Sequence, residues 1–305
     1  MTSRFLSAPP SLVLPPQASH TLTDCNIKRQ NMVSFPYHQL TKIHLTERAL
    51  ADLNRLNDPD APNPMPSTLT ERKTTAYDRN FDQLLFDKGY KSCWMERLPK
   101  AGNWKEIQAM LSNDPIASSE DDYDTFVELL NDSRNETKLR TNVLPLFLRR
   151  LRIPNEQDML FNNLEPLNEG LADAKPDLYD GARPSTLDPE IRACLSKMIV
   201  PSKDTSAPIL PNFFLEFKGP DGTPAVARRQ ILQDGSLGAR AIKSLQEWRS
   251  VSDEGAHTIS GTFHDGILDL YTTHCTMEEK NRPVYYTNII FTRNMRQDPR
   301  SLGEG

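Results

Sequence analysis

The segment Pro211-Asn-Phe-Phe-Leu-Glu-Phe-Lys-Gly219 decides how the rest of the chain is interpreted. Its aromatic and aliphatic content and its length predict a β-strand. Because successive side chains of a strand point to opposite faces, Glu216 and Lys218 share one face with Phe214. Phe217 points in the other direction with the alternate apolar residues, toward the expected core. The segment therefore holds a carboxylate and an ammonium close together on a rigid element.

A carboxylate and a lysine in this arrangement can serve a divalent cation and a phosphate. Glu216 can ligate a hard cation, and the carbonyl of Phe217 can supply a second oxygen ligand. Lys218 can orient or deprotonate a water molecule, or stabilise negative charge that develops on the phosphate. A Glu-x-Lys triplet is expected about once by chance in a chain of this length. An ordinary ion pair on a strand is therefore the alternative for the isolated triplet.

Two further carboxylates stand where such a site needs them. Asp177 follows a proline at an expected strand start, 39 residues before Glu216, although an Asp in that position is often only a turn residue. Glu136 lies three and seven residues before Leu139 and Val143 in an expected helix, on or beside its buried stripe. A carboxylate there is costly unless it is paired or ligating, and pointing outward at the edge of the stripe is the alternative.

The helix expected from Thr223 to about Trp248 follows the strand and carries polar candidates of its own. Gln230 would share a face with Val226 and Leu237, and a solvated helix residue is its alternative interpretation. Basic side chains in this helix can contact phosphates, although charged residues on a helix usually form a solvated face. The candidates for nucleic-acid contact are Arg228, Arg229, Arg240 and Lys243.

The remaining pattern predicts a mixed α/β fold in which helices cover a sheet. Further strands are expected at Thr258–Phe263, Ile267–His274 and Val284–Phe291, the first two forming a hairpin around His264-Asp-Gly. Pro145 is expected to kink or end one of the helices. The other expected helices cover Phe81–Lys88, Tyr123–Leu130, Asn135–Leu151 and the residues after Asp188.

Composition divides the chain into tails and a folded domain. Hydrophobic residues make up 37% of the 305 residues, and 24 prolines outnumber 13 glycines, so long unstructured stretches are expected. Residues 1–75 are predicted to be a Pro-, Ser- and Thr-rich tail with one short helix near Thr46, and residues 298–305 a second tail. The domain between them, 76–297, comprises a helical lead-in over 76–134 and a core over 135–297.

Charge and cysteine content argue against several functional classes. The net charge of -5 does not suit a protein that coats nucleic acid, so nucleic-acid contact requires a local basic patch. Four separated cysteines without a CxxC pair argue against a zinc ribbon and against a disulfide-stapled secreted domain. No stretch approaches the roughly 18 apolar residues of a membrane span, and prolines interrupt the N-terminal apolar run, so an intracellular protein of the nucleus or cytoplasm is expected. Strand alternation and turns would scatter the one local cluster of zinc-type ligands, which is His257, His264, His274 and Cys275.

Taken in order, these motifs resemble the PD-(D/E)XK nuclease superfamily, and more narrowly the PD-(D/E)XK nuclease-like proteins of filamentous fungi. The likeness extends over roughly residues 76–291, and the ordered set is more specific than any one motif. The segments that carry it are Asn135-Glu136, Lys175-Pro-Asp177, Pro211–Gly219, Arg229-Gln230, Asp234–Ala241 and Phe263–Tyr271.

The resemblance implies a restriction-endonuclease-like αβββαβ core with helical N-terminal additions. It implies Mg²⁺, or Mn²⁺, held by Asp177 and Glu216, with Lys218 at the attacking water. Glu136 would support the metal site, and Gln230 would support the lysine or the phosphate. The expected activity is hydrolysis of phosphodiester bonds in DNA, and the expected partner is nucleic acid, with no membrane involved. A catalytically inactive nuclease-fold module that binds nucleic acid or protein is the alternative, because the superfamily includes such members.

Overall fold

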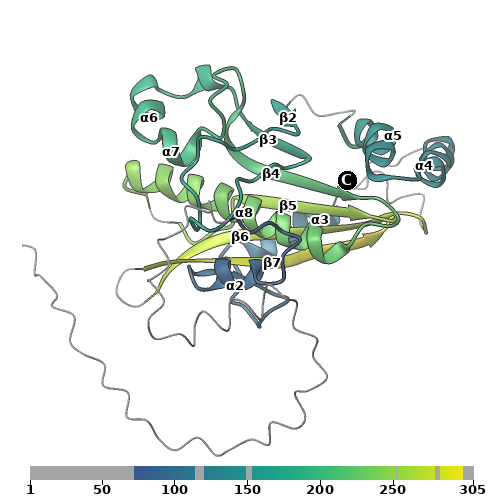
Figure 1. Cartoon of the computed structure of the whole chain (residues 1–305), viewed down its shortest axis with the longest axis horizontal. Coiled ribbons are helices and arrows are strands. Elements are labelled where there is room, and N and C mark those ends of the chain that lie inside the picture. The colour runs from purple at the N-terminus through teal and green to yellow at the C-terminus, as the bar shows by residue number, and fades with distance from the viewer. Residues whose placement is uncertain (1–71, 114–119, 149–152, 252, 279–281, 298–305) are drawn as a thin grey trace, which may run out of the picture. The chain divides into compact units, whose positions relative to one another are not determined.

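The computed structural model describes residues 72–113, 120–148, 153–251, 253–278 and 282–297, all within the unit Thr70–Gly305 (Figure 1). Most of the predicted N-terminal tail, including the helix near Thr46, lies outside the described residues, as does the tail 298–305. Described structure begins shortly before residue 76, because Thr74 already forms an isolated parallel bridge with Leu171. None of the described helices is long and apolar enough to cross a membrane.

The centre of the domain is a seven-stranded mixed sheet with the strand order β1-β7-β6-β5-β4-β3-β2. The pairs β1–β7 and β4–β5 are parallel, and the other pairs of neighbouring strands are antiparallel. The strands are β1 (Tyr90–Ser92), β2 (Asn155–Gln157), β3 (Leu178–Ala182), β4 (Ile209–Lys218), β5 (Thr258–His264), β6 (Ile267–Glu278) and β7 (Arg282–Asn294).

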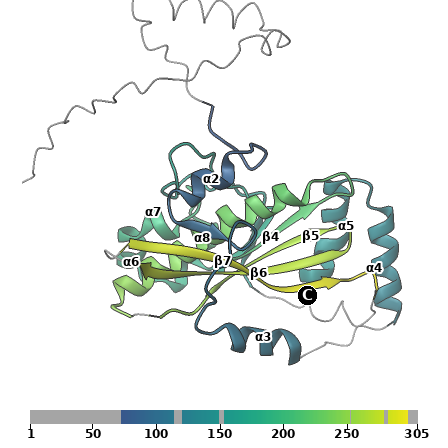
Figure 2. The same cartoon turned by 90° about the horizontal axis from the view of Figure 1, so that it is seen from below.

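Helices pack on both faces of this sheet, which confirms the expected mixed α/β class. The long helix α8 runs along one face, while α4 and α5 lie side by side and pack on the other (Figures 1 and 2). The helices are α2 (Phe81–Phe86), α3 (Trp104–Asn113), α4 (Glu120–Asp132), α5 (Glu136–Leu148), α6 (Pro189–Cys194), α7 (Ser196–Ile199) and α8 (Pro224–Trp248), with a 3-10 turn η2 (Pro184–Thr186).

Two hydrophobic clusters lie on opposite faces of the sheet, and β4 contributes to both. Phe217 packs with side chains of α4 and α5, as expected for the core face. Phe214, on the Glu216 face, is equally buried, and it packs with side chains of α2 and α8. Both faces of β4 are therefore core from Phe214 to Lys218, so a polar group in this part of the strand is taken out of water and needs a partner.

Local sequence signals confirm several predicted elements. α8 follows Thr223, has a proline in its first turn and ends at Trp248, as predicted. β5 and β6 form the predicted hairpin, whose turn residues Asp265 and Gly266 have φ of 49° and 79°. Both positive angles match a type I′ turn, for which Asp-Gly is a favoured pair.

Other elements differ from the expectation. The structure adds β1, β2 and α3, which the sequence pattern does not predict; strands of three residues carry too little alternation to be recognised. Pro145 does not end α5, which continues to Leu148. From α5 to β5 the order of elements is helix, three strands, helix and strand, with α6 and α7 inserted between β3 and β4.

Candidate active site

The antiparallel pairing of β3 with β4 brings the two predicted metal ligands together. Leu178 lies opposite Leu215, so Asp177 reaches the strand position beside Glu216. The backbone N–H of Asp177 donates to Glu216 Oε1 at 3.1 Å. In return, the backbone N–H of Phe217 donates to Asp177 Oδ2 at 2.8 Å. Backbone donors therefore hold one oxygen of each carboxylate in place, and both side chains are buried.

Lys218 lies at the end of β4 with its ammonium among carboxylates. Its Nζ donates to the carbonyl of Phe217 at 2.7 Å and lies 3.5 Å from oxygens of both Glu216 and Glu136. Burial by itself would lower the pKa of Lys218, but the charges of Glu216, Asp177 and Glu136 outweigh burial and raise that pKa. The lysine is therefore held in its charged form.

Glu136 reaches Lys218 because the chain after β4 passes very close to the start of α5. A Cβ on Gly219 would lie 2.7 Å from the backbone nitrogen of Glu136, so only glycine permits this approach. Asn135 caps the helix, since its Oδ1 accepts from the backbone N–H of Lys138 at 2.8 Å. Glu136 is thus the first residue of α5, half exposed at 43%, and lies beside the buried stripe.

The site contains a carboxylate that the sequence analysis did not select. Asp234 of α8 is 2% exposed and lines the same cavity as Glu216, which is fully buried. Burial raises the pKa of both carboxyls, and the charge of Asp177 raises them further. Two such carboxyls in contact share a proton rather than ionise together. Oε2 of Glu216 has no hydrogen-bond donor, only the ammonium of Lys218 at 3.5 Å.

The small residues that follow Asp234 in α8 are a sequence signal for its burial. A Cβ on Gly235 would lie 2.7 Å from the hydroxyl oxygens of Ser260 and Thr273, so α8 touches the sheet there with almost no side chain between them. An acidic residue within a run of glycine, serine and alanine on a helix indicates such a close approach. Asp234 also stands one helical turn after Gln230, on the same side of α8.

Arg140 is a second participant that sequence reasoning missed. It stands one turn after Glu136 on α5, and its Nη1 lies 2.8 Å from Asp177 Oδ1. Its Nη2 pairs with Asp158 at 2.7 Å. Asp177 therefore accepts from a backbone N–H on one oxygen and from a guanidinium on the other.

Gln230 lies in the same cavity as the buried carboxylates, as its assignment to the site requires. The cavity has a volume of about 140 Å³, and Gln230, Glu216, Asp234, Tyr77 and Lys175 are among the residues that line it. The Oε1 atom of Gln230 is buried and has no hydrogen-bond donor in the structure. The structure thus brings together Asp177, Glu216, Lys218, Glu136 and Gln230.

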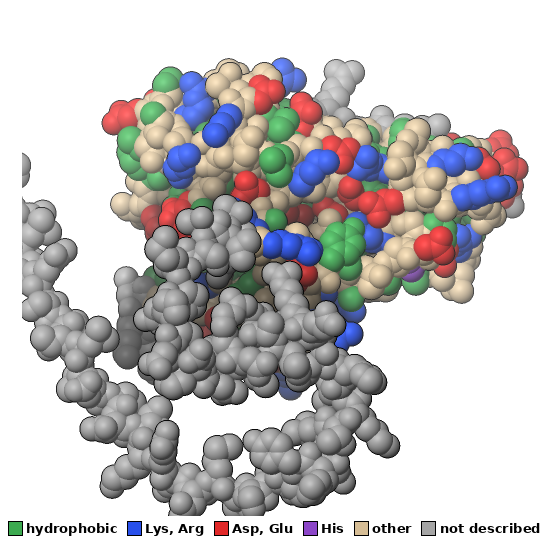
Figure 3. Space-filling model, viewed as in Figure 1, with side chains coloured by type: hydrophobic (Ala, Val, Ile, Leu, Met, Phe, Trp, Pro, Cys, Tyr) green, Lys and Arg blue, Asp and Glu red, His purple; other side chains and the backbone are tan. Residues whose placement is uncertain are grey.

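The four basic candidates of α8 lie apart from this cluster or are engaged elsewhere. Arg229 Nε is 2.7 Å from Asp82 Oδ2, and Arg240 donates to two backbone carbonyls. Lys243 pairs with a glutamate one turn further on, and Arg228 is exposed. Thirteen helical residues, roughly 20 Å, separate Lys243 from Gln230. On the face shown in Figure 3, basic and acidic side chains are interspersed and form no patch of one sign.

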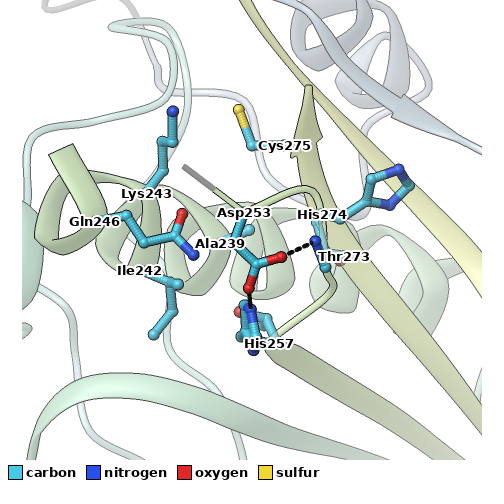
Figure 4. Close-up of a pocket in the computed structure, with 11 residues that line it drawn as sticks. Ala239, Ile242, Lys243, Gln246, Asp253, His257, Thr273, His274 and Cys275 are labelled. Carbon is cyan, nitrogen blue, oxygen red and sulfur yellow. Dashed lines mark hydrogen bonds and ion pairs between the residues drawn. The ribbon is translucent and has the colours of Figure 1, made fainter. Parts of the chain in front are cut away.

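A second polar pocket lies between α8 and β6, where most of the histidine and cysteine cluster falls (Figure 4). His257 pairs with Asp253, and the ring of His274 points away from Cys275. Burial lowers the pKa of His274 to about 4. Within the described residues, no group of three or more His, Cys, Asp or Glu side chains is arranged to hold a metal.

The oxygens around β4 nevertheless suit a hard cation in chemical type. Asp177, Glu216 and the carbonyl of Phe217 offer oxygen atoms, which Mg²⁺ prefers. Oε2 of Glu216, buried without a donor, is the oxygen in this set that most needs a cation. Arg140 and Lys218 now lie against the other members of the set, so a cation would take over contacts that these side chains make.

The fold and this cluster define a mixed α/β protein with a buried carboxylate–lysine site at the end of a central strand. No protein-family model matches the chain, and no curated protein matches it.

Proposed function

We propose that this protein is a nuclease that hydrolyses phosphodiester bonds in DNA with Mg²⁺, or Mn²⁺, as its cofactor. One observation carries the proposal. The carboxylate of Glu216 accepts from the backbone N–H of Asp177, the carboxylate of Asp177 accepts from the backbone N–H of Phe217, and a charged Lys218 lies 3.5 Å from Glu216. Carboxylates that can bind a cation, next to a buried ammonium that can bind a phosphate, suit phosphoryl transfer.

The residues of the cluster have separate roles in the proposed reaction. Asp177, Glu216 and the Phe217 carbonyl would hold the cation, which when bound polarises a phosphate and lowers the pKa of a water molecule. Lys218 keeps its proton, so it acts as a donor to a phosphate oxygen and stabilises the negative charge that develops there. A lysine with a raised pKa is a poor base, which favours this role over deprotonation of water.

Glu136 is the member of the cluster best placed to accept a proton. It is half exposed, in contrast to Glu216, and lies 3.5 Å from the ammonium of Lys218. A water molecule bound between these two side chains would donate one hydrogen to Glu136 while its oxygen attacks phosphorus. The leaving oxygen of the sugar then takes a proton from solvent, which completes hydrolysis.

Cleavage assays on matched variants test this proposal. Glu216→Gln and Lys218→Met keep the side-chain size and remove the charge, and each is expected to lower magnesium-dependent cleavage of DNA by about 10²-fold or more. Glu278→Gln on β6 and Lys105→Met on α3 make the same chemical changes away from the site and should cleave as the wild type does. RNA substrates run in parallel identify the preferred nucleic acid.

Thermal melts of the same variants separate loss of chemistry from loss of fold. A variant that melts like the wild type and cleaves at the wild-type rate would refute the assignment of its residue. Equal cleavage by all five proteins would refute the proposal as a whole.

A second candidate function is a catalytically inactive nuclease-fold module that binds nucleic acid or protein. One contact favours it: the guanidinium of Arg140 already holds Asp177 Oδ1 at 2.8 Å, where a metal ligand would need a free oxygen. Calorimetric titration with MgCl₂ and MnCl₂ discriminates between the candidates. Heat of binding that disappears in Glu216→Gln supports the nuclease, and absence of binding by the wild type supports the inactive module.

A further inference from the structure

A rigid turn presents an aromatic ring at the cavity beside the candidate active site. The turn comprises Thr75 to Asp78, and the side chain of Tyr77 within it is 72% exposed. The N–H and the hydroxyl of Thr75 both donate to Asp78 Oδ2, at 2.8 and 3.0 Å. The backbone N–H of Asp78 in turn donates to the carbonyl of Thr75 at 2.9 Å. The residues around Tyr77 therefore fix its backbone without involving its ring.

The same turn is anchored to the rest of the domain from both sides. Thr74 donates to the carbonyl of Gly170 at 2.7 Å and accepts from the backbone N–H of Ala172 at 2.9 Å. Arg229 donates to the carbonyl of Ala76 at 3.2 Å while its Nε is held by Asp82. Arg229 therefore fixes the Tyr77 turn against α8. Because the backbone is already fixed, only the side-chain torsions of Tyr77 have to be ordered when a flat ligand binds.

The ring of Tyr77 lies next to the residues that would carry the chemistry. Tyr77 lines the cavity of about 140 Å³ that also contains Glu216 and Gln230, and Glu216 lies 3.5 Å from the ammonium of Lys218. A cavity of about 150 Å³ can hold a benzene ring. Lys175, whose side chain is 55% exposed, lines the same cavity and can meet a phosphate.

A single exposed aromatic side chain is common on protein surfaces and needs no explanation by itself. Three observations distinguish Tyr77: its backbone is fixed on both sides, its ring is free, and it lines a cavity of one-ring size together with Glu216. Flat aromatic rings on a basic or mixed surface are the usual stacking partners of unpaired bases. In a duplex both faces of each base are already stacked, so an unpaired base is the ligand that fits.

We propose that Tyr77 is a stacking platform for an unpaired base of single-stranded DNA, which places the adjoining phosphate at Lys218. The choice of nucleic acid as ligand rests on the proposed nuclease function. Arg229 acts as a positioning residue for the turn. This role replaces the phosphate contact expected for Arg229 from its place in a basic run of α8.

Binding to two oligonucleotides of equal charge tests the stacking role. One is a fluorescently labelled single-stranded DNA, and the other is its abasic counterpart, which has the same phosphates and no bases. The full chain, Tyr77→Ala, Tyr77→Phe and the control Met110→Ala are titrated in EDTA, where no strand is cleaved. Met110 is 75% exposed on α3, so its variant makes a comparable surface change elsewhere.

The wild type is expected to bind the base-bearing strand about tenfold more tightly than the abasic strand. Tyr77→Ala should lose most of this preference, whereas Tyr77→Phe and Met110→Ala should keep it. A Tyr77→Ala protein that keeps the preference, or a wild type without any, would overturn the inference. The phenylalanine variant guards against an effect of misfolding, because it retains the ring.

The result also separates this inference from the nuclease proposal. Base-dependent binding that needs the ring, in a protein that cleaves nothing with magnesium, supports the stacking site and refutes the nuclease. If the protein cleaves DNA but binds the base-bearing and the abasic strand with equal affinity, the result supports the nuclease and refutes the stacking site.

Discussion

Asp180 of β3 allows a quantitative test of how the sheet carries buried charge. Its side chain is 5% exposed, and its Oδ1 atom has no hydrogen-bond partner. Burial raises the pKa of Asp180 from 3.8 to about 6. Asp180→Asn keeps the shape of the side chain and removes its titration, so the difference between the two proteins isolates this one group.

The expected magnitude follows from proton linkage. A shift of about two pKa units corresponds to about 3 kcal/mol, at about 1.4 kcal/mol per unit. Because the pKa is raised in the folded state, the folded state binds more protons than the unfolded state between pH 3.8 and about 6. The contribution of Asp180 to the free energy of unfolding is therefore fully present below pH 3.8 and is lost as the pH rises through about 6. The wild type should lose about 3 kcal/mol relative to Asp180→Asn across this window, with no further change above it.

Urea unfolding at half-unit steps from about pH 3 to about pH 8, a range that extends beyond both pKa values, measures this difference. Asp124→Asn on α4 serves as the control, because Asp124 is exposed on its helix. The pH dependence of the other carboxyls is shared by all three proteins and cancels when their curves are subtracted. A flat difference between wild type and Asp180→Asn would show that the carboxyl is solvated or paired, and would refute the reasoning.

Other predictions concern the packing and charge of the same core. Phe217→Ala should lower the free energy of unfolding by about 3–5 kcal/mol, because Phe217 is fully buried against Phe147 and Phe263. Chemical denaturation measures this free energy, and a loss of less than about 1 kcal/mol would contradict the prediction. Gly238→Ala should lower the melting temperature, because the added Cβ would lie 2.8 Å from Phe214 Cε2 and from the carbonyl oxygen of Pro211. Overpacking of this kind costs about 1–3 kcal/mol, which exceeds the gain of about 1 kcal/mol in helix propensity. A higher melting temperature for the variant would contradict the prediction. The pKa values of Asp234 and Glu216 are both raised, so ionisation of either carboxyl lowers the free energy of unfolding. In Asp234→Asn the free energy of unfolding should therefore fall less steeply as the pH rises above the usual carboxyl range, by up to about 1.4 kcal/mol per pH unit. Urea titrations measure the two slopes, and equal slopes for the variant and the wild type would contradict a proton shared by the two carboxyls.

The parts of the fold that were predicted correctly are those with local causes. The aromatic run of β4 and the alternation of its faces follow from the segment itself. The limits of α8 follow from a proline in its first turn and a long periodic stretch, and the β5–β6 hairpin follows from an Asp-Gly pair. The short strands β1 and β2 escaped prediction, because only their neighbours in the sheet make them strands.

The candidate site shows the same division between local and tertiary causes. Glu216 and Lys218 share a face by strand geometry alone, so the sequence predicts their proximity. The contact of Asp234 with Glu216 depends on how closely α8 approaches β5 and β6 at Gly235, and no periodicity encodes that distance. Arg140 likewise reaches Asp177 only because α5 packs beside β3 and β4.

The charge balance of the cluster connects the fold with the proposed chemistry. Asp177, Glu216, Asp234 and Glu136 contribute four carboxyls, and Lys218 and Arg140 contribute two cations. If every group were ionised, two negative charges would remain uncompensated in a largely buried space, which is costly. A proton retained between Glu216 and Asp234, whose pKa values are both raised, compensates one of these two charges. A bound divalent cation would supply two positive charges and compensate both. The excess of acidic groups thus lowers the stability of a core that has only a structural role. A magnesium-dependent hydrolase requires this negative charge, because carboxylates bind its cation.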